Sequence, residues 1–293
     1  MYNQCPLCGS SNLVSYLQVK DYSVSQHQFQ LMQCRECHYV GTSNAPTQAD
    51  IAPYYAFENY ISHTNTNKGV INKIYHLVRK RTLNTKYKLV KKYTKLTIGS
   101  VLDIGCGTGA FLGIMQSHKW VVTGIEPDDK ARDLASNLHQ VTPLPSNEMA
   151  NLKQYQYHAV TMWHVLEHVH QLHTYFNTIS TLLVPKGILL IAVPNYTSPD
   201  AKHYQQYWAG YDVPRHLHHF SPKSIAHLAV QHNFSIIATL PMWYDAFYVS
   251  MLSEKYKNGN LINAIYQGIK TTFTTLKNTE SSSSLIYILQ KNY

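Results

Sequence analysis

Residues 163–169 read WHVLEHV, and within them His164, Glu167 and His168 form the pattern H-x-x-E-H. In one class of zinc proteases this pattern supplies two histidine ligands to a metal and a glutamate that acts as the base. If the same residues instead follow a β-strand, they offer an acid/base pair beside a bound substrate. Spacing alone allows both kinds of chemistry, so the neighbouring elements must decide between them.

Four of the five cysteines lie near the amino terminus, as the two C-x-x-C pairs Cys5/Cys8 and Cys34/Cys37. Two such pairs, about 25 residues apart, supply the four thiolates of a tetrahedral zinc site. Between them, the segments LVSYLQV and HQFQLMQ alternate like strands, which predicts a zinc ribbon. Because all four ligands are Cys, no position stays open for water, and we expect a structural zinc.

Context disfavours two other uses of these cysteines. No feature of the sequence indicates secretion, the setting in which disulfides persist. Neither pair opens a helix after a strand, as a redox C-x-x-C does. A module of about 40 residues has little apolar material of its own, so metal binding is expected to supply much of its folding free energy. Gly9 and Gly41 follow the two pairs, where tight turns favour positive φ.

A glycine-rich turn is predicted in SVLDIGCGTGAF, residues 100–111. Residues 101–104 read as a short buried strand, Gly105, Gly107 and Gly109 as the turn, and residues 110–115 as a helix. Such a turn lets backbone amides approach a ligand closely. The spacing Gly105-x-Gly107-x-x-Ala110 also fits the dinucleotide-binding pattern, so the glycines alone do not identify the ligand.

Two carboxylates distinguish the ligands. Asp103 lies two residues before the first glycine of the turn, where it would repel a pyrophosphate but attract an amino group. Glu126 follows the predicted strand 120–125, where its two oxygens can accept both hydroxyls of a ribose. Together the two acids and the glycines predict a pocket for an adenosine that carries an amino-acid tail.

These residues resemble the first motif of the class I S-adenosylmethionine-dependent methyltransferases, VLDIGCGTG, followed by an acid at the end of the second strand in GIEP. The resemblance covers about residues 98–293 and implies an α/β fold, a Rossmann-like sheet of seven strands with helices on both faces. It also implies S-adenosylmethionine as the methyl donor. The cofactor-binding residues it implies are Asp103, Gly105, Cys106, Gly107, Gly109, Glu126, Pro127 and Trp163, with Asn147 and Glu148 in PSNEM the candidates for the adenine contact.

The same order of elements resolves the H-x-x-E-H pattern. Residues 157–163, YHAVTMW, read as a buried strand, so HVLEH begins at a strand end. The helix comes only afterwards, with Leu172, Phe176, Ile179 and Leu183 at helical spacing and Lys186-Gly187 expected to end it. A zinc protease needs both histidines on one helix face, so a metal hydrolase is disfavoured. LEHV resembles the fourth-strand motif of quinone-type small-molecule O-methyltransferases.

An oxygen or carbon acceptor must lose a proton, so His164, Glu167 and His168 are candidate catalytic residues. The alternative is that Glu167 and His168 cap the next helix and orient the loop.

A second histidine cluster lies in DVPRHLHHF, residues 212–220. His216 is a further candidate base, and Arg215 and His219 are expected to bind an acidic group on the acceptor. Ser221 and Pro222 predict the start of a helix. Residues 196–220 as a whole are expected to form the acceptor loop. The last two strands are expected at 234–240 and 285–289, separated by an insert at 241–284.

Positive charge is concentrated between Glu58 and Asp103, where ten basic residues and no acidic one occur; the rest has 15 basic and 16 acidic residues. Apolar residues at helical spacing predict one or two amphipathic helices there. The charges fit either a solvated helix face or contact with a phosphorylated acceptor, an RNA or an acidic membrane surface. The ten residues are Lys68, Lys73, Arg79, Lys80, Arg81, Lys86, Lys88, Lys91, Lys92 and Lys95.

The expected organisation is a zinc-ribbon module at 1–42, a linker with basic helices at 43–96 and a methyltransferase domain at 97–293. The longest apolar run, residues 188–193, is far shorter than the roughly 18 residues of a membrane span. The amino terminus also lacks the layout of a signal peptide, so a cytoplasmic location is expected.

The sequence therefore predicts an enzyme that methylates oxygen or carbon of a small molecule, such as a nucleotide- or lipid-linked sugar or a quinone-like acceptor. An RNA methyltransferase with a zinc-ribbon RNA-binding module is the first alternative. Against it, WHVL stands where amine-methylating enzymes usually carry [DN]-P-P-[FY], and Cys106 lies in the cofactor turn. A non-catalytic protein that binds S-adenosylmethionine is the second alternative, although the retained acids and glycines argue against it.

Overall fold

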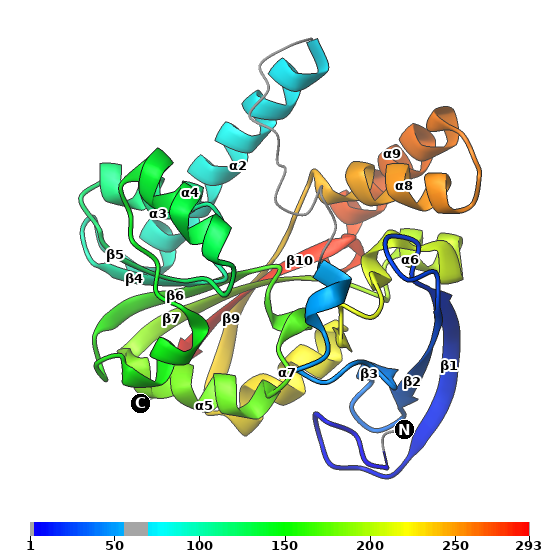
Figure 1. The fold of residues 1–293 in the computed structure, drawn as a ribbon, viewed down its shortest axis with the longest axis horizontal. Coiled ribbons are helices and arrows are strands. Elements are labelled where there is room, and N and C mark those ends of the chain that lie inside the picture. The colour runs from blue at the N-terminus through cyan, green and yellow to red at the C-terminus, as the bar shows by residue number, and fades with distance from the viewer. Residues whose placement is uncertain (1–2, 56–69, 293) are drawn as a thin grey trace. The chain divides into compact units, whose positions relative to one another are not determined.

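The computed structural model describes residues 3–55 and 70–292, with the side chains of α2 (Val70–Thr94) described from Val78 onward. The predictions for Lys68 and for the side chain of Lys73 lie outside the described residues. The fold is drawn in Figure 1. The chain divides into two compact units, each built from three segments of the sequence. Unit 1 comprises Met1–Phe57, His164–Tyr175 and Ile191–Tyr287, and unit 2 comprises Glu58–Trp163, Phe176–Leu190 and Ile288–Tyr293.

Unit 2 is built on parallel strands. β4 (Ser100–Ile104) pairs with β5 (Val121–Ile125) on one side and with β6 (Tyr157–Trp163) on the other, both in parallel register. Every residue of β4 is buried, as expected for a strand covered on both faces. The sheet order is β5-β4-β6-β7-β10-β9, with β7 at Leu183–Pro194, β10 at Ser284–Lys291 and β9 at Phe234–Pro241.

Helices cover both faces of this parallel sheet (Figure 1). α2, α3 (Ala110–Ser117) and α4 (Asp129–His139) lie on one face, and α5 (Leu172–Leu182) lies on the other. α5 ends at Leu182 and β7 begins at once, so the predicted helix end at Lys186-Gly187 was too late. The predicted α/β, Rossmann-like class is confirmed.

In the described part of the chain this sheet has six strands rather than the expected seven. Beside β5, at the edge of the sheet, Leu144 makes a single parallel bridge to Ile125. Its N–H donates to the carbonyl of Gly124, and its carbonyl accepts from the N–H of Glu126. Pro143 and Pro145 flank Leu144. Both backbone groups of Leu144 face β5, so those of the two prolines face away from it, and the missing N–H groups leave no donor there for a further strand.

Unit 1 contains a four-stranded sheet of order β1-β2-β3-β8. β1 (Leu13–Lys20), β2 (Gln28–Cys34) and β3 (Val40–Ser43) form an antiparallel meander, as the sequence predicted for the first two. β8 (His218–His219) pairs antiparallel with β3. The amino-terminal meander is thus extended by two residues that lie about 175 positions further along the chain.

The core of unit 1 explains the aromatic residues that follow β7. Val19, Phe29, Leu31 and Val40 of the meander pack with a group of side chains from residues 196–213. That group is Tyr196, Ala201, Tyr204, Trp208, Tyr211 and Val213. Residues 196–211 therefore contribute a buried core, although their sequence lacks any clear period.

Side-chain caps begin three of the remaining α-helices, α6 (Pro199–Tyr204), α7 (Pro222–Gln231) and α9 (Leu261–Lys277). Ser198 is the N-cap of α6, and Ser221 is the N-cap of α7, as predicted for α7. A capping box between Ser221 and Ser224 completes the start of α7. The insert at 241–284 folds into α8 (Asp245–Tyr256) and α9. The short 3₁₀ helices are η1 (Ala52–Tyr55), η2 (Ser146–Asn151), η3 (Leu166–His168), η4 (Gln205–Tyr207), η5 (Ala209–Tyr211) and η6 (Thr279–Ser281). Among the helices that the structure describes, none combines the length and apolarity needed to cross a membrane.

Candidate functional site

The turn after β4 adopts the geometry that its glycines predict. Gly105, Gly107 and Gly109 have φ values of 68°, 54° and 75°, in the left-handed region that favours glycine. The N–H groups of Gly105 and Cys106 both donate to the carbonyl of Ile125, at 2.7 Å and 3.1 Å. The turn is therefore fixed to the end of β5.

Two of these glycines differ in their surroundings. A Cβ atom at Gly109 would lie 2.8 Å from side-chain atoms of Ala135 and Val141, so this position is needed for packing against α4 and the following loop. At Gly107 no described atom lies within 4 Å of an added Cβ. The backbone at Gly107 is thus open on the side where a ligand would approach.

Asp103 is a buried carboxylate at the end of β4, with 2% of its surface exposed. The hydroxyl of Thr161, on β6, donates to its Oδ1 at 2.5 Å. Burial raises the pKa of Asp103 to about 7, against the opposing effects of the Thr161 hydrogen bond and the positive charge of Lys86. An ammonium group placed beside Asp103 would favour the ionised carboxylate.

Glu126, at the end of β5, connects the glycine turn to the start of α4. Its Oε2 accepts the N–H of Gly107 at 2.8 Å, and its Oε1 accepts the N–H of Asp128 at 3.0 Å. Burial raises the pKa of Glu126, although both backbone hydrogen bonds act in the opposite direction. Each oxygen keeps a further lone pair, so the carboxylate can still accept from two hydroxyls.

Trp163, the last residue of β6, provides an unusual donor. Among the described residues, no acceptor lies within hydrogen-bonding distance of its buried Nε1. The ring contacts Phe111 edge to face, and the ammonium of Lys86 lies 4.5 Å from the ring centroid. A buried donor without a partner is costly, so Trp163 Nε1 fits a site that a polar ligand completes.

The other predicted cofactor residues lie near this turn in the sequence but differ in exposure. Cys106 is buried beneath the turn, where burial raises the pKa of its thiol. Pro127 is exposed, and its carbonyl accepts from Arg132 Nη1 at 2.9 Å. Asn147 is exposed in η2. The role of each of these three residues stays a prediction.

Sequence reasoning missed Thr161 and Lys86. Thr161 is the polar residue inside the otherwise apolar end of β6, and its burial next to Asp103 follows from the parallel pairing of β4 and β6. Lys86 was counted among the basic residues of α2, yet its ammonium faces Trp163. A lysine with a specific aromatic partner cannot be distinguished from its solvated neighbours by sequence alone.

In unit 1, His164 lies between two carboxylates. Its Nδ1 is 3.4 Å from Glu167 Oε1, and its Nε2 is 3.2 Å from Asp245 Oδ2. Burial favours the neutral ring, but hydrogen bonding to Asp245 and Glu167 outweighs it and raises the pKa of His164 to about 10. Since 34% of the side chain is exposed, solvent screens part of this attraction. Asp245 lies in the insert and was not predicted from the sequence.

Glu167, in η3, is fully buried, and in the described structure neither of its carboxylate oxygens has a hydrogen-bond partner of good geometry. Burial alone would raise the pKa of Glu167, but His164 and the nearby histidines outweigh this effect and lower it. The charge of His164, whose Nδ1 lies 3.4 Å from Oε1, offsets part of the desolvation of this carboxylate, and among the described residues no hydrogen bond of good geometry adds to it. This environment fits a role in binding or proton transfer.

His168 and His216 each contact a backbone carbonyl through Nδ1. His168 Nδ1 lies 3.0 Å from the carbonyl of Arg215 and 3.0 Å from the hydroxyl of Tyr55, and His216 Nδ1 lies 2.9 Å from the carbonyl of Gly210. Because a carbonyl only accepts, Nδ1 is the donor in both carbonyl contacts. His216 Nε2 lies 3.9 Å from Asp212 Oδ2 and 4.0 Å from Glu167 Oε1. Burial, followed by the charge of His216, lowers the pKa of His168 to about 4, so this ring is neutral near pH 7.

Arg215 is buried, with its guanidinium fully engaged. Nε and Nη2 form a bidentate pair with Asp212, and Nη1 donates to the carbonyl of Tyr54 at 3.0 Å. Asp21 Oδ1 lies a further 3.9 Å from Nη1. Through these contacts Arg215 connects Asp212 to the segment that contains Tyr54. An acceptor could bind Arg215 only if the ion pair with Asp212 rearranged.

His219 also lies inside unit 1. It is buried in β8, where its Nε2 is 3.0 Å from the hydroxyl of Thr42. Burial lowers its pKa well below the ordinary value, so the ring is neutral. Its neighbour His218 is 2.5 Å from the hydroxyl of Tyr39 through Nδ1. These contacts join β8 to the meander, and an acceptor-binding role for His219 stays a prediction.

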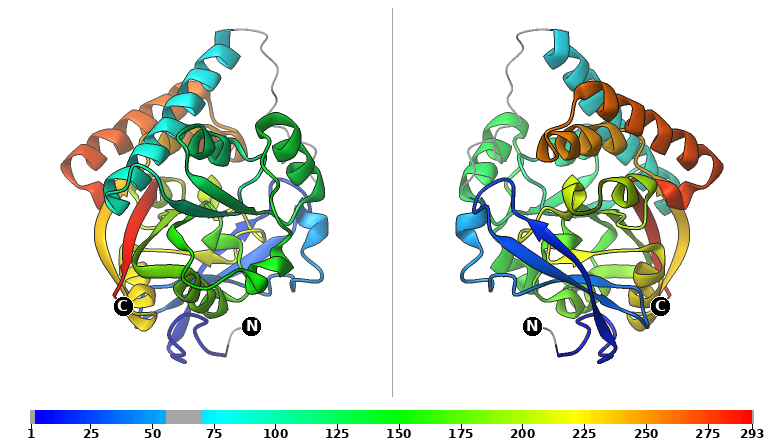
Figure 2. Two further views of the ribbon diagram at one scale, coloured as in Figure 1. Left: turned by 90° about the vertical axis from the view of Figure 1, so that its left-hand side faces the viewer. Right: turned by 90° about the vertical axis from the view of Figure 1, so that its right-hand side faces the viewer.

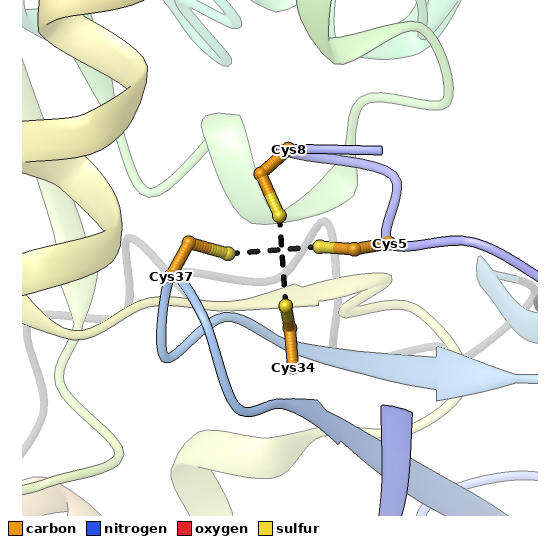
Figure 3. A group of neighbouring side chains, drawn as sticks. All are labelled: Cys5, Cys8, Cys34 and Cys37. Carbon is orange, nitrogen blue, oxygen red and sulfur yellow. Dashed lines mark hydrogen bonds between the residues drawn. The ribbon is translucent and has the colours of Figure 1, made fainter. Parts of the chain in front are cut away.

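The four amino-terminal cysteines converge on one point (Figure 3). Cys5 Sγ lies 3.6 Å from Cys37 Sγ, Cys8 Sγ lies 3.5 Å from Cys34 Sγ, and all four sulfurs lie within 4.8 Å of one another. A tetrahedral zinc with bonds of about 2.3 Å places its sulfurs about 3.8 Å apart. The four cysteines form no disulfide. Their arrangement therefore fits a zinc ion.

The turns beside these cysteines depart from the prediction at one position. Gly9 has φ 76°, as expected, but Gly41 lies in β3 and does not have positive φ. His38 takes the left-handed conformation after the second pair, with φ 54°. Its N–H donates to the carbonyl of Cys34 at 3.1 Å, so the turn closes one residue after Cys37.

One further group of ligand-type residues lies in unit 1. Glu167, His168 and His216 place a carboxylate oxygen and two ring nitrogens within 4.8 Å of one another. A divalent cation could use such a set, as could a proton that moves between a carboxylate and an imidazole.

Comparison with known proteins agrees with this architecture. A family model described as a methyltransferase domain matches residues 75–239, more than half of the chain. The chain therefore belongs to the methyltransferase domain family. None of the curated proteins matches the sequence.

Solved structures show the same fold at low sequence identity. Geranyl diphosphate C-methyltransferase from Streptomyces coelicolor A3(2) is 13% identical, with a TM-score of 0.57 over 85% of this chain and 99% of that chain. A protein described as a sarcosine dimethylglycine methyltransferase from Galdieria sulphuraria is 10% identical, with a TM-score of 0.51 over 73% of this chain and 86% of that one.

Phosphoethanolamine N-methyltransferase 2 from Haemonchus contortus is 17% identical, with a TM-score of 0.49 over 72% of this chain. The chain covers 53% of that protein, about half of its length.

Proposed function

We propose that unit 2 binds S-adenosylmethionine and that the enzyme transfers its methyl group to oxygen or carbon of a small molecule. The observation that carries the proposal is the pair of buried carboxylates, Asp103 and Glu126, on either side of a glycine turn whose backbone is open at Gly107. An acid before the turn suits an ammonium group, whereas a dinucleotide would bring a pyrophosphate there.

The residues on the donor side have distinct roles in this proposal. Asp103 binds the amino group of the methionine portion, and Glu126 binds the ribose hydroxyls. The open backbone at Gly107 lets the ligand approach, and Trp163 Nε1 gains the acceptor that it lacks among the described residues. When bound, the sulfonium supplies an electrophilic methyl group. The chain's task is to hold the acceptor in line and to remove its proton.

The proposed proton acceptor lies in the cluster of Glu167, His168 and His216. Neutral His168 keeps a lone pair on Nε2, and Glu167 Oε1 lies 4.0 Å from His216 Nε2. Either imidazole can take the acceptor proton when its ring is neutral, with the Glu167 carboxylate stabilising the resulting cation. His164, held between Glu167 and Asp245, keeps this carboxylate ionised.

The acceptor class follows from charge as well as from chemistry. Lys88, Lys91, Lys92 and Lys95 line a shallow hollow on the surface of unit 2. Such a hollow suits a phosphate or diphosphate handle, as a nucleotide- or lipid-linked sugar would carry; a quinone-like acceptor carries no such handle. The solved geranyl diphosphate C-methyltransferase acts on a diphosphate and methylates carbon, which is compatible with this class.

The cysteine site is proposed to hold a structural zinc in a module at residues 1–42. The convergence of the four sulfurs supports it, and the full set of thiolate ligands leaves no position for a catalytic water. A linker at 43–96 and a methyltransferase domain at 97–293 complete the proposed organisation. The ion would add its binding free energy to the folding of the meander.

An RNA acceptor is the second candidate, because the same lysine-lined hollow suits a phosphodiester backbone. A radiolabelled methyl-donor assay against fractionated small molecules and RNA separates the two. We expect label in a small-molecule fraction with the unmodified enzyme, and none with Glu167→Gln. Label only in RNA, together with a gel shift that weakens steeply with salt, would favour the alternative. Failure to bind the donor in calorimetry would contradict both.

A further inference from the structure

The insert at 241–284 presents an apolar surface that the methyltransferase fold does not use. Its helices α8 and α9 lie side by side (Figures 1 and 2). Six large apolar side chains of α9 recur every three or four residues and form one stripe, with exposed fractions from 42% to 79%. They are Ile262, Ile265, Tyr266, Ile269, Phe273 and Leu276. Tyr248 and Met251 of α8 are exposed as well.

The buried faces of the two helices are made of small or polar residues. α9 buries Ala264, Gln267, Gly268, Thr271 and Thr275. A Cβ atom at Gly268 would lie 2.6 Å from the ring of Phe247, so the helices approach closely there. A helix of a water-soluble domain normally places large apolar residues inside and polar ones outside. The pair therefore has the reverse pattern, which indicates an apolar environment around its outer face.

The exposed charged side chains of α8 and α9 are positive. α9 contains no acidic residue and carries Lys270 and Lys277. On α8, Glu254 is buried and Asp245 is paired with His164. Exposed Lys255 adds further positive charge at the end of α8, and Lys257 lies 3.9 Å from Glu254 Oε1.

We propose that α8 and α9 form a docking surface for an anionic lipid bilayer. The apolar stripe would enter the boundary between head groups and acyl chains, with α9, about 25 Å long, lying in the plane of the membrane. Tyr248 and Tyr266 suit the head-group region, where aromatic side chains with a polar end are enriched. The lysines would bind lipid phosphates while their methylene chains stay near the apolar layer.

Charge favours a bilayer over a second copy of the chain. A two-fold symmetric dimer through this face would bring the same residues of both copies together. Lys270 and Lys277 would then face an equally positive surface that lacks exposed acids on α9, and would repel it. An anionic bilayer instead complements both the stripe and the lysines.

Co-sedimentation of the full chain with vesicles tests this proposal. We expect binding to vesicles of phosphatidylcholine with phosphatidylglycerol, and much weaker binding to pure phosphatidylcholine. The double variant Ile269→Gln/Phe273→Gln should lose at least tenfold in vesicle affinity. Val230→Gln is the matched control, because Val230 is 76% exposed on α7 of the same unit yet lies outside the stripe.

A charge variant provides a second measurement. Lys270→Gln/Lys277→Gln should weaken binding to the anionic vesicles by about fivefold for each lysine, and binding should fall with added salt. Lys223→Gln, an exposed lysine of α7, should have little effect. Trp243 lies just before α8 with 43% of its surface exposed, so quenching of its fluorescence by brominated lipid should accompany binding.

Several outcomes would overturn the proposal. The stripe variant could sediment like the unmodified chain, or no vesicle could bind either protein. A dimer in analytical ultracentrifugation that dissociates in the stripe variant, without vesicle binding, would make this face a subunit interface. Calorimetry with S-adenosylmethionine runs in parallel as a fold control. Donor binding without vesicle binding contradicts only the membrane surface, and the reverse result contradicts only the proposed donor site.

Discussion

The glycine turn of unit 2 and the histidine cluster of unit 1 are built in different ways. The glycine turn comes from one continuous stretch of sequence, a strand–turn–helix–strand unit that contains Asp103, the glycines and Glu126. The histidine cluster gathers Glu167, His168 and His216 with Asp245 from segments far apart in the chain. A site formed by local geometry can be predicted from spacing, whereas one formed by long-range packing cannot.

Removal of a zinc ligand should have the largest effect on stability, because unit 1 is held together by contacts between segments far apart in the sequence. Cys34→Ser takes one thiolate from a buried site and should lower the melting temperature by on the order of 10 °C. Zinc content per chain, measured by mass spectrometry, should fall with it. Cys106→Ser is the control, since this buried cysteine of unit 2 lies outside the cluster. Equal zinc content in Cys34→Ser and the unmodified chain would refute a four-cysteine site.

Glu167→Gln tests whether the cluster does chemistry. The amide keeps the shape of the side chain but cannot stabilise a protonated imidazole, so kcat should fall by about 10²- to 10⁴-fold. Donor affinity in calorimetry should stay within twofold, because Glu167 belongs to unit 1. Glu280→Gln, an exposed glutamate in η6 of the same unit, serves as the matched change. A normal kcat with a lowered melting temperature would assign Glu167 a structural role instead.

Asp103→Asn should weaken binding of the methyl donor and leave the histidine cluster of unit 1 unchanged. Loss of a charged partner for the ammonium group should weaken S-adenosylmethionine binding roughly 10- to 100-fold. Thr161→Val, which removes the hydroxyl bonded to Asp103, should have a smaller effect in the same direction. Unchanged donor affinity in Asp103→Asn would rule out the proposed ammonium contact.

The same carboxylate predicts a pH dependence of the free energy of unfolding. Its pKa is about 7 in the folded chain, above the ordinary 3.8, so its contribution is fully present below about pH 4. That contribution is lost as the pH rises through 7, where folding must bury the ionised form. Denaturant unfolding without ligand should show this decline between pH 4 and 7, and Asp103→Asn should not show it. A parallel decline in both proteins would assign the effect to other groups.

Substitutions at Gly107 and Gly109 should have the smallest effects, and they distinguish packing from ligand binding within the glycine turn. Gly109→Ala places a Cβ atom against Ala135 and Val141 at positive φ, so it should destabilise the fold by about 1–3 kcal/mol. Gly107→Ala has the same kind of strain without a clash, and should cost less stability but weaken donor binding. Chemical unfolding and calorimetry measure the two effects. If Gly109→Ala instead weakened donor binding more than Gly107→Ala, the ligand would approach the turn at Gly109.

The elements predicted with most success were those whose signals are local. The strand at 157–163 matches β6 at both ends, and the cap at Ser221 forms with its capping box. Predictions failed where packing overrides local preference. Of the expected seven strands the described residues form six, with a single bridge at Leu144 beside β5, and the aromatic segment after β7 is core. Neither the flanking prolines nor the irregular spacing of the aromatics was sufficient to reveal this beforehand.

Arg215 shows why residue type alone is an uncertain guide to function. An arginine beside several histidines suggested an acceptor contact, but its guanidinium is bound by Asp212 three residues earlier. The acidic partner was visible in the sequence, yet an i,i+3 pair forms only if the backbone turns there. Asp212 takes the left-handed conformation at φ 33°, and this turn brings the two side chains together.

The sequence by itself determined the parallel sheet, the glycine turn with its two carboxylates, and the four cysteines as a candidate metal site. Each is fixed within a few residues by steric rules, or by the strict ligand requirements of a metal. Only the tertiary structure decided that β8 extends the meander and that Glu167 is buried without hydrogen bonds. It also decided that α9 turns its apolar residues outward. These features depend on which distant segments pack together, and short-range spacing carries no information about that.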